Sequence, residues 1–281
     1  MSELRGKGEA VAGVPDGPLL SIDTSTPSMT MALTVGDEVL VERTTNAERN
    51  HSVQLLPEID ALVRSAGLRP REVRAVAVGC GPGSYTGVRI GVTMAKTFAW
   101  ALGLPVYGVS SLEALAYGGW RDAFAGGTTA VQAPAWIVPA LDARRGQAYT
   151  ALFEASGDAG EGGGSAWRRA SADAVVPFQG QAEAWLGAAD RPGTVVFVGE
   201  VDGSFADMLD AAASGAQAVV LRRPWAMAAR DIAAVARLHG ETVRVRDPHD
   251  LLPNYAQLAE AEAKLAAAGE AAARERARER N

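Results

Sequence analysis

The first hydrophobic pattern along the chain predicts strands. Residues 19–22 form a short apolar run, and over 29–35 apolar residues alternate with small or hydroxyl-bearing ones. A period of two is typical of a strand with one face in solvent. Gly36 and Asp37 then suit a two-residue turn into a further strand over 39–44. The chain is therefore expected to open with three strands, the last two joined as a hairpin.

Downstream, the period lengthens to that of helices. Apolar residues recur every three or four positions over 52–67 and again over about 86–102. Continuous apolar runs at 75–78 and 106–109 flank the second helix and read as buried strands. Strand, helix and strand in this order make a βαβ unit. Together with the hairpin, this unit predicts an α/β fold with a mixed sheet covered by helices.

The helix over 86–102 is apolar on nearly every side. A helix lying on its own sheet needs one apolar face, so a second apolar stripe (Ile90, Met94, Phe98 and Ala101) predicts another cover. Gly87, Gly91 and Ala95 are four apart and leave a shallow groove for a close backbone, although each mid-helix glycine costs about 1 kcal/mol. Two interpretations stay open, a central helix buried within the chain and a subunit interface.

If the helix over 86–102 is an interface, its candidate residues are Gly87, Val88, Arg89, Gly91, Val92, Ala95, Lys96 and Ala99.

A glycine-rich turn precedes the longer helix. Gly81 and Gly83 let the backbone fold tightly beside the helix N-terminus, and together with Ser84 they are candidates to contact an anion. The turn lacks the lysine of a Walker P-loop, and Ser84 is not centred between glycines as in a nucleophile elbow. The alternative is that the turn binds nothing and only leads the chain into the helix.

A second small-residue turn follows the first strand. Asp23, Thr24 and Ser25 place a carboxylate among hydroxyl groups, a set suited to a phosphate and, through water, a magnesium ion. The same residues also form turns in which the carboxylate only closes the loop. Both interpretations stay open.

From about residue 128 the pattern restarts with less regularity, which predicts a second lobe. Its expected strands lie at 136–141, 148–153, 195–198 and 218–221. Its expected helices lie near 181–189, 205–212 and 225–238. The predicted divisions are a disordered tail (1–17), an N-terminal lobe with the interface helices (18–127), a smaller C-terminal lobe (128–255) and a charged helix (256–281).

Composition narrows the function classes. Among the 281 residues, 48% are hydrophobic and 21% charged, which excludes a disordered chain. A net charge of −6 argues against broad nucleic-acid binding by this chain alone. Cys80 is the single cysteine, so neither an internal disulfide nor a cysteine metal cluster is expected. No window is apolar enough for a membrane span, and we expect a cytoplasmic protein.

Several motifs between about residues 19 and 150 resemble the bacterial TsaB family, also called YeaZ. They are IDTST at 22–26, HSVQLLPEID at 51–60, GPGSYTGVRIGVTMAK at 81–96, PVYGVSSLEALA at 105–116 and LDARRGQAY at 141–149.

The resemblance implies an actin-like (ribonuclease H-like) two-lobe fold. It implies that the chain is a non-catalytic scaffold that binds and activates TsaD. TsaD, this scaffold and the ATPase TsaE would together make N6-threonylcarbamoyladenosine at position 37 of transfer RNAs that read ANN codons. The helices matching 52–67 and 86–102 would form the bundle with TsaD, which adds Leu55, Ile59 and Leu62 to the candidate interface residues. When TsaD is absent, the apolar helix over 86–102 is itself expected to pair with a second copy of the chain. The chain would contact transfer RNA only as part of the complex.

The resemblance also bears on cofactors. The chain would bind none by itself, but ATP or ADP could be shared at the interface. The candidate nucleotide contacts are Asp23, Thr24, Ser25, Gly81, Gly83 and Ser84.

Departures from the catalytic sister TsaD weigh against catalysis. Its His-x-x-x-His metal pair is matched here by Ser111, which is a poor metal ligand, and Leu115, which is none. Its Ser-Gly-Gly-His-Thr loop is replaced by residues 142–146. The alternative function is an actin-like ATPase or sugar-kinase-type enzyme that uses the Asp23 and Gly81–Gly83 loops. No Ser/His/Asp arrangement or His-Glu-x-x-His helix supports a peptidase.

Overall fold

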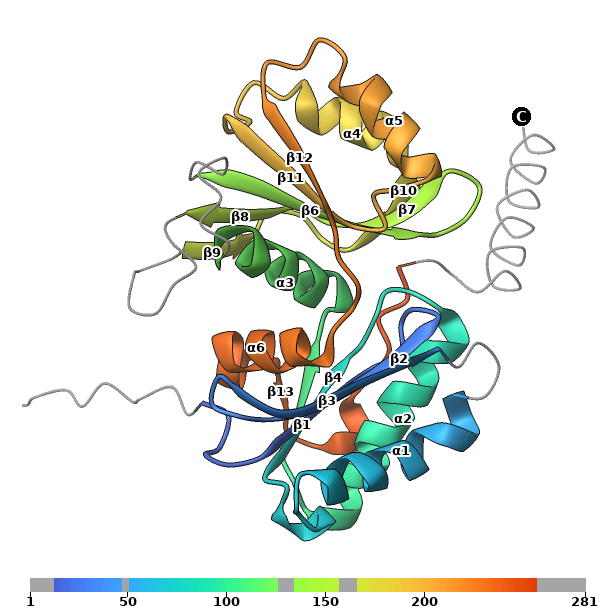
Figure 1. Cartoon of the computed structure of the whole chain (residues 1–281), viewed down its shortest axis with the longest axis vertical. Helices are drawn as coiled ribbons and strands as arrows, with labels where there is room; N and C mark the ends of the chain where they lie inside the picture. Colours follow the sequence, from blue (N-terminus) through green and yellow to red (C-terminus); the bar gives the residue numbers. More distant parts are fainter. Residues whose placement is uncertain (1–12, 47–50, 126–133, 157–165, 257–281) are drawn as a thin grey trace, which may run out of the picture.

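The structure is a computed structural model, and it describes residues 13–46, 51–125, 134–156 and 166–256. Two mixed sheets form two lobes (Figure 1). The first sheet has the strand order β13-β5-β4-β1-β2-β3 within the described ranges. Its strands are β1 (Leu19–Asp23), β2 (Ser28–Val35), β3 (Glu38–Asn46), β4 (Ala75–Gly79), β5 (Val106–Val109) and β13 (Arg244–Val245).

The second sheet has the order β10-β7-β6-β11-β12, and β8 joins it through β6 and pairs with β9. Strands β6, β11 and β12 run parallel, whereas β7 and β8 pair antiparallel with β6. The strands are β6 (Ala135–Asp142), β7 (Gln147–Thr150), β8 (Phe153–Ser156), β9 (Ala166–Arg169), β10 (Ala174–Pro177), β11 (Thr194–Gly199) and β12 (Val219–Pro224).

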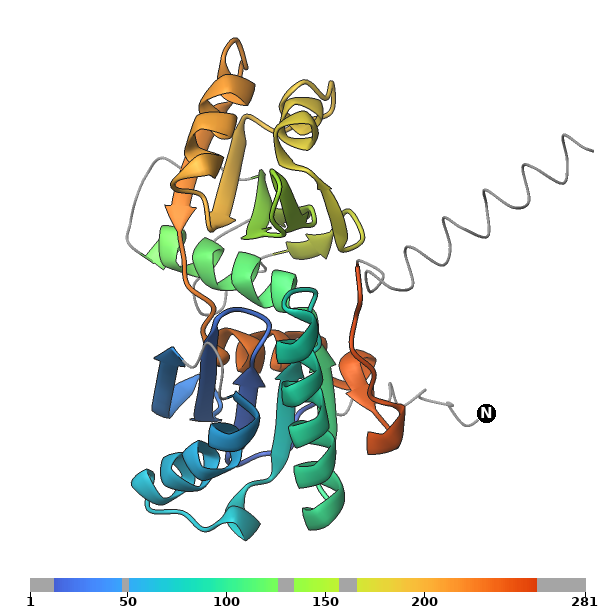
Figure 2. The ribbon, with the colours of Figure 1, turned by 90° about the vertical axis from the view of Figure 1, so that its right-hand side faces the viewer.

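Helices cover both faces of each sheet, as Figures 1 and 2 show. On the outer face of the first sheet lie α1 (His51–Ser65) and α2 (Tyr85–Leu102), and on that of the second lie α4 (Phe178–Leu186) and α5 (Ser204–Ala213). Between the sheets, α6 (Ala229–His239) packs on the first and α3 (Ser111–Ala125) on the second, and these two helices contact each other. This is the actin-like two-lobe arrangement.

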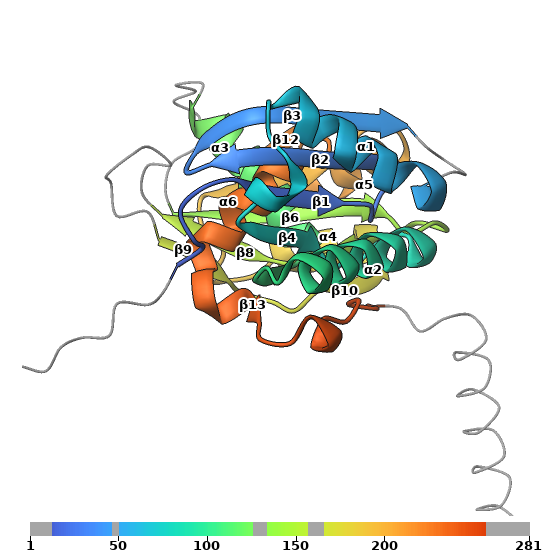
Figure 3. The same cartoon turned by 90° about the horizontal axis from the view of Figure 1, so that it is seen from below.

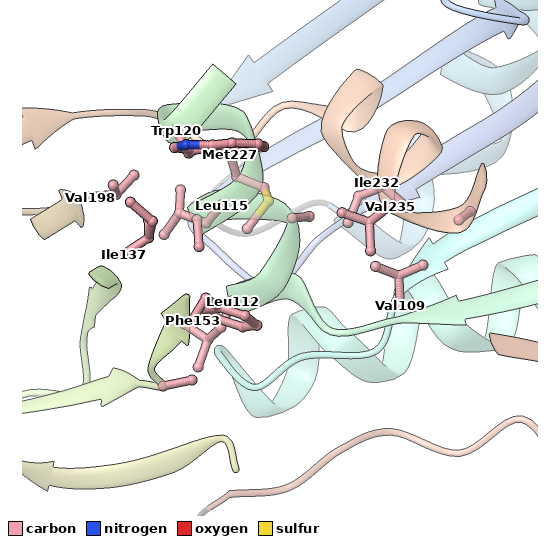
Figure 4. Close-up of a cluster of buried hydrophobic side chains, with 14 of the residues drawn as sticks. Val109, Leu112, Leu115, Trp120, Ile137, Phe153, Val198, Met227, Ile232 and Val235 are labelled. Atoms are coloured by element: carbon pink, nitrogen blue, oxygen red, sulfur yellow. The ribbon is translucent and has the colours of Figure 1, made fainter. Parts of the chain in front are cut away.

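The two lobes share one apolar core (Figure 4). Trp120 and Phe153 belong to the same buried cluster as Ile232 and Val235, which lie on the helix that covers the first sheet. Neighbouring residues on a strand point to opposite faces, so Ile137 enters this central core while Val138 enters the outer core beneath α4 and α5. Apolar side chains on both faces explain why these strands read as continuous hydrophobic runs.

Most predicted elements are confirmed, with shifts of a few residues at their ends. The predicted strand over 148–153 is in fact two strands, β7 and β8, which pair with different parts of β6. The exposed face predicted for β2 is also wrong. Thr30 and Thr34 are buried beneath α6, where Thr30 Oγ1 accepts a hydrogen bond from Ala229 N (3.1 Å) and Thr34 Oγ1 accepts one from Arg237 (2.9 Å).

The predicted lobe boundaries need one correction. Residues 128–255 do not form a single lobe, because α6 packs on β1 and β2, and β13 pairs with β5. The second lobe is therefore an insertion between α3 and α6. The predicted tail and charged helix lie outside the described residues, except for residues 13–17, where Val14 packs against the central core, and for Ala256.

The contact between α3 and α6 contains a buried carboxylate. Asp231 is 4% exposed, and its Oδ2 accepts a hydrogen bond from Trp225 Nε1 (3.0 Å). A Cβ at Gly118 of α3 would lie less than 3.0 Å from this oxygen, so only glycine fits there. Burial raises the pKa of Asp231 from 3.8 to about 6, more than the Trp225 hydrogen bond lowers it.

This raised pKa predicts that Asp231 favours folding in acid. Between its two pKa values the folded chain holds a proton that the unfolded chain releases, so the contribution is complete below 3.8 and is lost as pH rises through about 6. The loss is expected to reach about 3 kcal/mol at neutral pH. Asp231→Asn should therefore raise the urea midpoint at pH 8 but not at pH 4. The control Asp190→Asn, at an exposed position, should leave the urea midpoint unchanged at both pH values. If the midpoints of the two variants changed with pH in the same way, the raised pKa would not belong to Asp231.

Candidate functional site

Asp23, at the end of β1, lies at the centre of the first candidate loop. Its Oδ1 accepts hydrogen bonds from the backbone N (2.8 Å) and the Oγ (2.7 Å) of Ser25, and its Oδ2 accepts one from Ser111 Oγ (2.6 Å). Burial raises the pKa of Asp23, although these hydrogen bonds act in the opposite direction. A Cβ at Gly79 would lie less than 3.0 Å from Oδ2, so β4 closes the remaining side.

The two candidate loops lie against each other. Thr24 Oγ1 donates to Gly87 O (2.7 Å), and Ser84 N donates to Ser25 O (2.7 Å). Cβ atoms at Gly83 and Gly87 would lie less than 3.0 Å from the carbonyl oxygens of Ser25 and Thr24, so these glycines allow the contact. Ser84 also caps α2 by accepting from Gly87 N (3.3 Å).

The structure thus brings together all six predicted nucleotide contacts. However, Asp23, Thr24 and Ser25 are at most 3% exposed, and their side-chain oxygens are bonded within the chain. This counts against direct nucleotide contact by these three side chains and agrees with the loop-closing interpretation. Nucleotide contact by the glycine loop stays a prediction.

Ser111 and Leu115, which the resemblance matches to the metal pair of TsaD, serve the packing of this chain. Ser111 Oγ accepts from Gly81 N (3.0 Å) while it donates to Asp23. Leu115 is fully buried in the central core. Among the residues that the structure describes, no three His, Cys, Asp or Glu side chains gather to hold a metal. A hydroxyl engaged on both sides and an apolar side chain do not fit a metal site.

A second polar cluster, here called the clasp, joins the lobes. It is centred on Glu113 of α3, whose Oε1 accepts from Trp167 Nε1 (3.0 Å) and His239 Nε2 (2.7 Å), and whose Oε2 pairs with Arg169 (3.0 Å). Arg169 also pairs with Asp173 (2.6 Å). Burial alone would raise the pKa of Glu113, but the contacts from His239, Trp167 and Arg169 outweigh it and lower the pKa.

The sequence predicts a different role for Glu113. At three residues after a serine it suits a reciprocal capping contact, and Ser110 does cap α3 by accepting from Glu113 N (3.2 Å). The Glu113 side chain instead turns to the clasp. No local pattern reveals this, because its partners come from β9 and α6, which lie 54 or more residues away.

The predicted interface residues mostly face the chain's own sheet. Leu55, Ile59 and Leu62 of α1 are at most 1% exposed. The apolar and glycine positions predicted on α2 are buried as well, and only Arg89 is exposed while Lys96 is half-buried. The space beside Gly87 and Gly91 is occupied by Thr24 of the same chain and leaves no room for the backbone of a partner. The buried residues of this set therefore do not lie on the surface that a partner would contact, whereas Arg89 and Lys96 reach it.

Other apolar residues of the same helices do reach the surface. Val53 and Leu56 of α1 are 73% and 53% exposed. In the second apolar stripe of α2, Ile90, Met94 and Phe98 are half-buried, and Ala101 is exposed. We call Val53, Leu56, Ile90, Met94 and Phe98 the α1–α2 seam. The second stripe is the sequence feature that indicated this seam, because a second apolar face on α2 predicts that something besides its own sheet packs on it.

The geometry of the two helices brings the seam together. Glu58 of α1 pairs with Arg43 of β3 (3.4 Å), and Leu56 lies about 160° around the helix from Glu58, on the flank towards α2. Lys96 of α2 donates to His249 O (2.7 Å), and Met94 lies about 160° around from it, on the flank towards α1. Figure 3 shows α1 on one side of α2 and the C-terminal segment, in red, on the other.

Comparison with known proteins gives the family. A family model described as TsaD, tRNA N6-adenosine threonylcarbamoyltransferase, matches residues 39–178. The Bacillus subtilis protein named tRNA threonylcarbamoyladenosine biosynthesis protein TsaB is 36% identical over 255 residues, which cover 88% of this chain and 96% of that protein. The chain belongs to the TsaB family.

Other TsaB-family proteins agree. The Escherichia coli protein of the same name is 36% identical over 136 residues, covering 48% of this chain and 54% of the relative. The solved structure of YeaZ from Pseudomonas aeruginosa has 26% identity and a TM-score of 0.63 over 85% of this chain and 99% of that chain. Both the resemblance and the fold predicted from it are confirmed. None of the described helices is long and apolar enough to cross a membrane.

Proposed function

We propose that this chain takes part in the biosynthesis of threonylcarbamoyladenosine in transfer RNA, as a non-catalytic subunit that binds and activates TsaD. The names of its TsaB relatives support the pathway. Within that pathway, the modified atom would be N6 of adenosine 37 in transfer RNAs reading ANN codons, and the ATPase TsaE would be a further member of the complex.

One observation carries the non-catalytic assignment. The carboxylate of Asp23 and the hydroxyl of Ser111, which lies where TsaD has a metal ligand, are hydrogen-bonded to each other and closed off by Gly79 and Gly81. A reaction centre needs polar groups that face a substrate. Here such groups stabilise the contact between β1, β4 and α3 instead.

The α1–α2 seam supports the proposed binding of TsaD. It combines Leu56, Val53 and the half-buried stripe of α2 on two helices that the first sheet holds rigidly. Exposed apolar residues gathered on neighbouring helices are typical of protein interfaces. In the absence of TsaD, the same seam is expected to pair with a second copy of the chain.

Reconstitution tests the proposal. The purified chain alone should not transfer threonylcarbamoyl to transfer RNA, whereas adding it to TsaD and TsaE should restore turnover. Ser111→Ala should leave turnover per folded complex unchanged, because Ser111 would only position Asp23. Turnover by the lone chain, or a selective loss of turnover in Ser111→Ala, would contradict the non-catalytic role.

The alternative enzyme, an actin-like ATPase or sugar kinase, is separated by calorimetry with Mg-ATP. Tight binding by the lone chain would favour it. Binding only in the presence of TsaD would favour ATP or ADP at a shared interface, in which Gly81, Gly83 and Ser84 remain the candidate contacts.

A further inference from the structure

The last described segment, residues 247–256, runs along α2 from the first lobe towards the second. We call it the C-terminal strap. It begins with the short helix η3 (Pro248–Asp250), and Figure 2 shows it in red beside the N-terminal half of α2. Neither the family motifs nor the proposed function involves this segment.

Three contacts fix the strap to the first lobe. Leu251 is 2% exposed and belongs to the outer core beneath α2. Lys96 Nζ donates to His249 O (2.7 Å). The ring of Tyr255 lies 4.9 Å from that of Tyr85, and Arg89 stacks over Tyr85 at 4.6 Å. The strap therefore follows the flank of α2 that faces away from α1.

Asn254 then joins the two lobes. Its backbone N donates to Cys80 O (2.7 Å), directly before the glycine loop of the first lobe. Its side-chain Nδ2 donates to Asp173 Oδ2 (2.8 Å) in the second lobe. The same Asp173 oxygen accepts from Ser110 Oγ (2.9 Å), and Oδ1 pairs with Arg169 of the clasp. One residue of the strap thus touches both sides of the boundary between the lobes.

We propose that the C-terminal strap is a latch that fixes the angle between the lobes, with Asn254 tying Cys80 of the first lobe to Asp173 of the second. Releasing Asn254 lets this edge open, while the shared core around α3 and α6 stays packed. Because α2 begins directly after the glycine loop, the latch also sets the position of the helix that carries three of the five seam residues.

Amide hydrogen exchange of the lone, full-length chain tests the latch. In Asn254→Ala, exchange should rise together by about 10-fold in residues 81–84 and 171–175, as expected for the loss of one hydrogen bond to a charged group. Strand β11 should not change. The matched control is Asn46→Ala in β3, the edge strand opposite β13, which removes the acceptor of a hydrogen bond from Ser28 Oγ of β2 (2.8 Å) and should alter neither segment.

Two further variants sharpen the test. Tyr255→Ala should raise exchange near Tyr85 only, and ending the chain after Pro253 should exceed the effect of Asn254→Ala. If the shortened chain does not fold, the hydrogen exchange of Asn254→Ala alone tests the latch. Unchanged exchange, or a rise on one side of the boundary only, would overturn the latch. The test contains no TsaD, so its failure would leave the proposed TsaD binding untouched.

Discussion

Replacing Leu56 by aspartate is expected to weaken TsaD binding by about 30-fold or more, the effect of losing one hot-spot residue. Leu56 is 53% exposed on the seam, so a carboxylate there remains solvated in the free chain but is desolvated against an apolar partner. Titration calorimetry with purified TsaD measures the affinity, and thermal unfolding should show an unchanged fold.

A matched substitution controls for adding a charge to a helix. Leu238→Asp changes a leucine that is 44% exposed on α6, away from the seam, and should leave TsaD affinity unchanged. Wild-type affinity in Leu56→Asp, or an equal loss in Leu238→Asp, would show that TsaD binds elsewhere.

Gly87→Val should destabilise the fold by about 4 kcal/mol, because even its Cβ would lie less than 3.0 Å from the backbone oxygen of Thr24. Neither the loop nor the helix can move away easily, since Thr24 Oγ1 also bonds to Gly87 O (2.7 Å). Urea unfolding measures the loss. A bulky residue at Gly87 is therefore no test of TsaD binding, since it damages the chain first.

The control is a helical glycine in open space. Nothing lies within 4 Å of a Cβ at Gly180 in α4, so Gly180→Ala should stabilise the fold by about 0.5 to 1 kcal/mol. A stable Gly87→Val variant would mean that the β1–β2 loop does not pack on α2 as described.

The sequence was informative where a pattern is local. The apolar runs of β1, β4 and β5 and the long period of α2 predicted the first lobe, and the motifs predicted the family. Gly87 of α2 correctly indicated a close backbone, whereas Gly91 lies against the side chain of Thr24. Their spacing does not say whose backbone that is, and Thr24, 63 residues from Gly87, was the answer.

Long-range pairing explains the remaining errors. β2 reads as half-exposed because nothing near it in sequence reveals that α6, about 200 residues later, will cover it. The clasp depends on Trp167 and Arg169 of β9, a strand of four residues with no clear alternation. Such contacts are fixed by the topology rather than by local propensity.

The insertion of the second lobe between α3 and α6 has a consequence for synthesis on the ribosome. Strands β6 to β12 are contiguous in sequence, so their sheet can form while the chain is still growing. The first sheet appears earlier but must wait for α6 before Thr30 and Thr34 find their partners. The half of the molecule that is translated first is thus the half completed last, and until then its inner face is open to chaperones or to misplaced contacts.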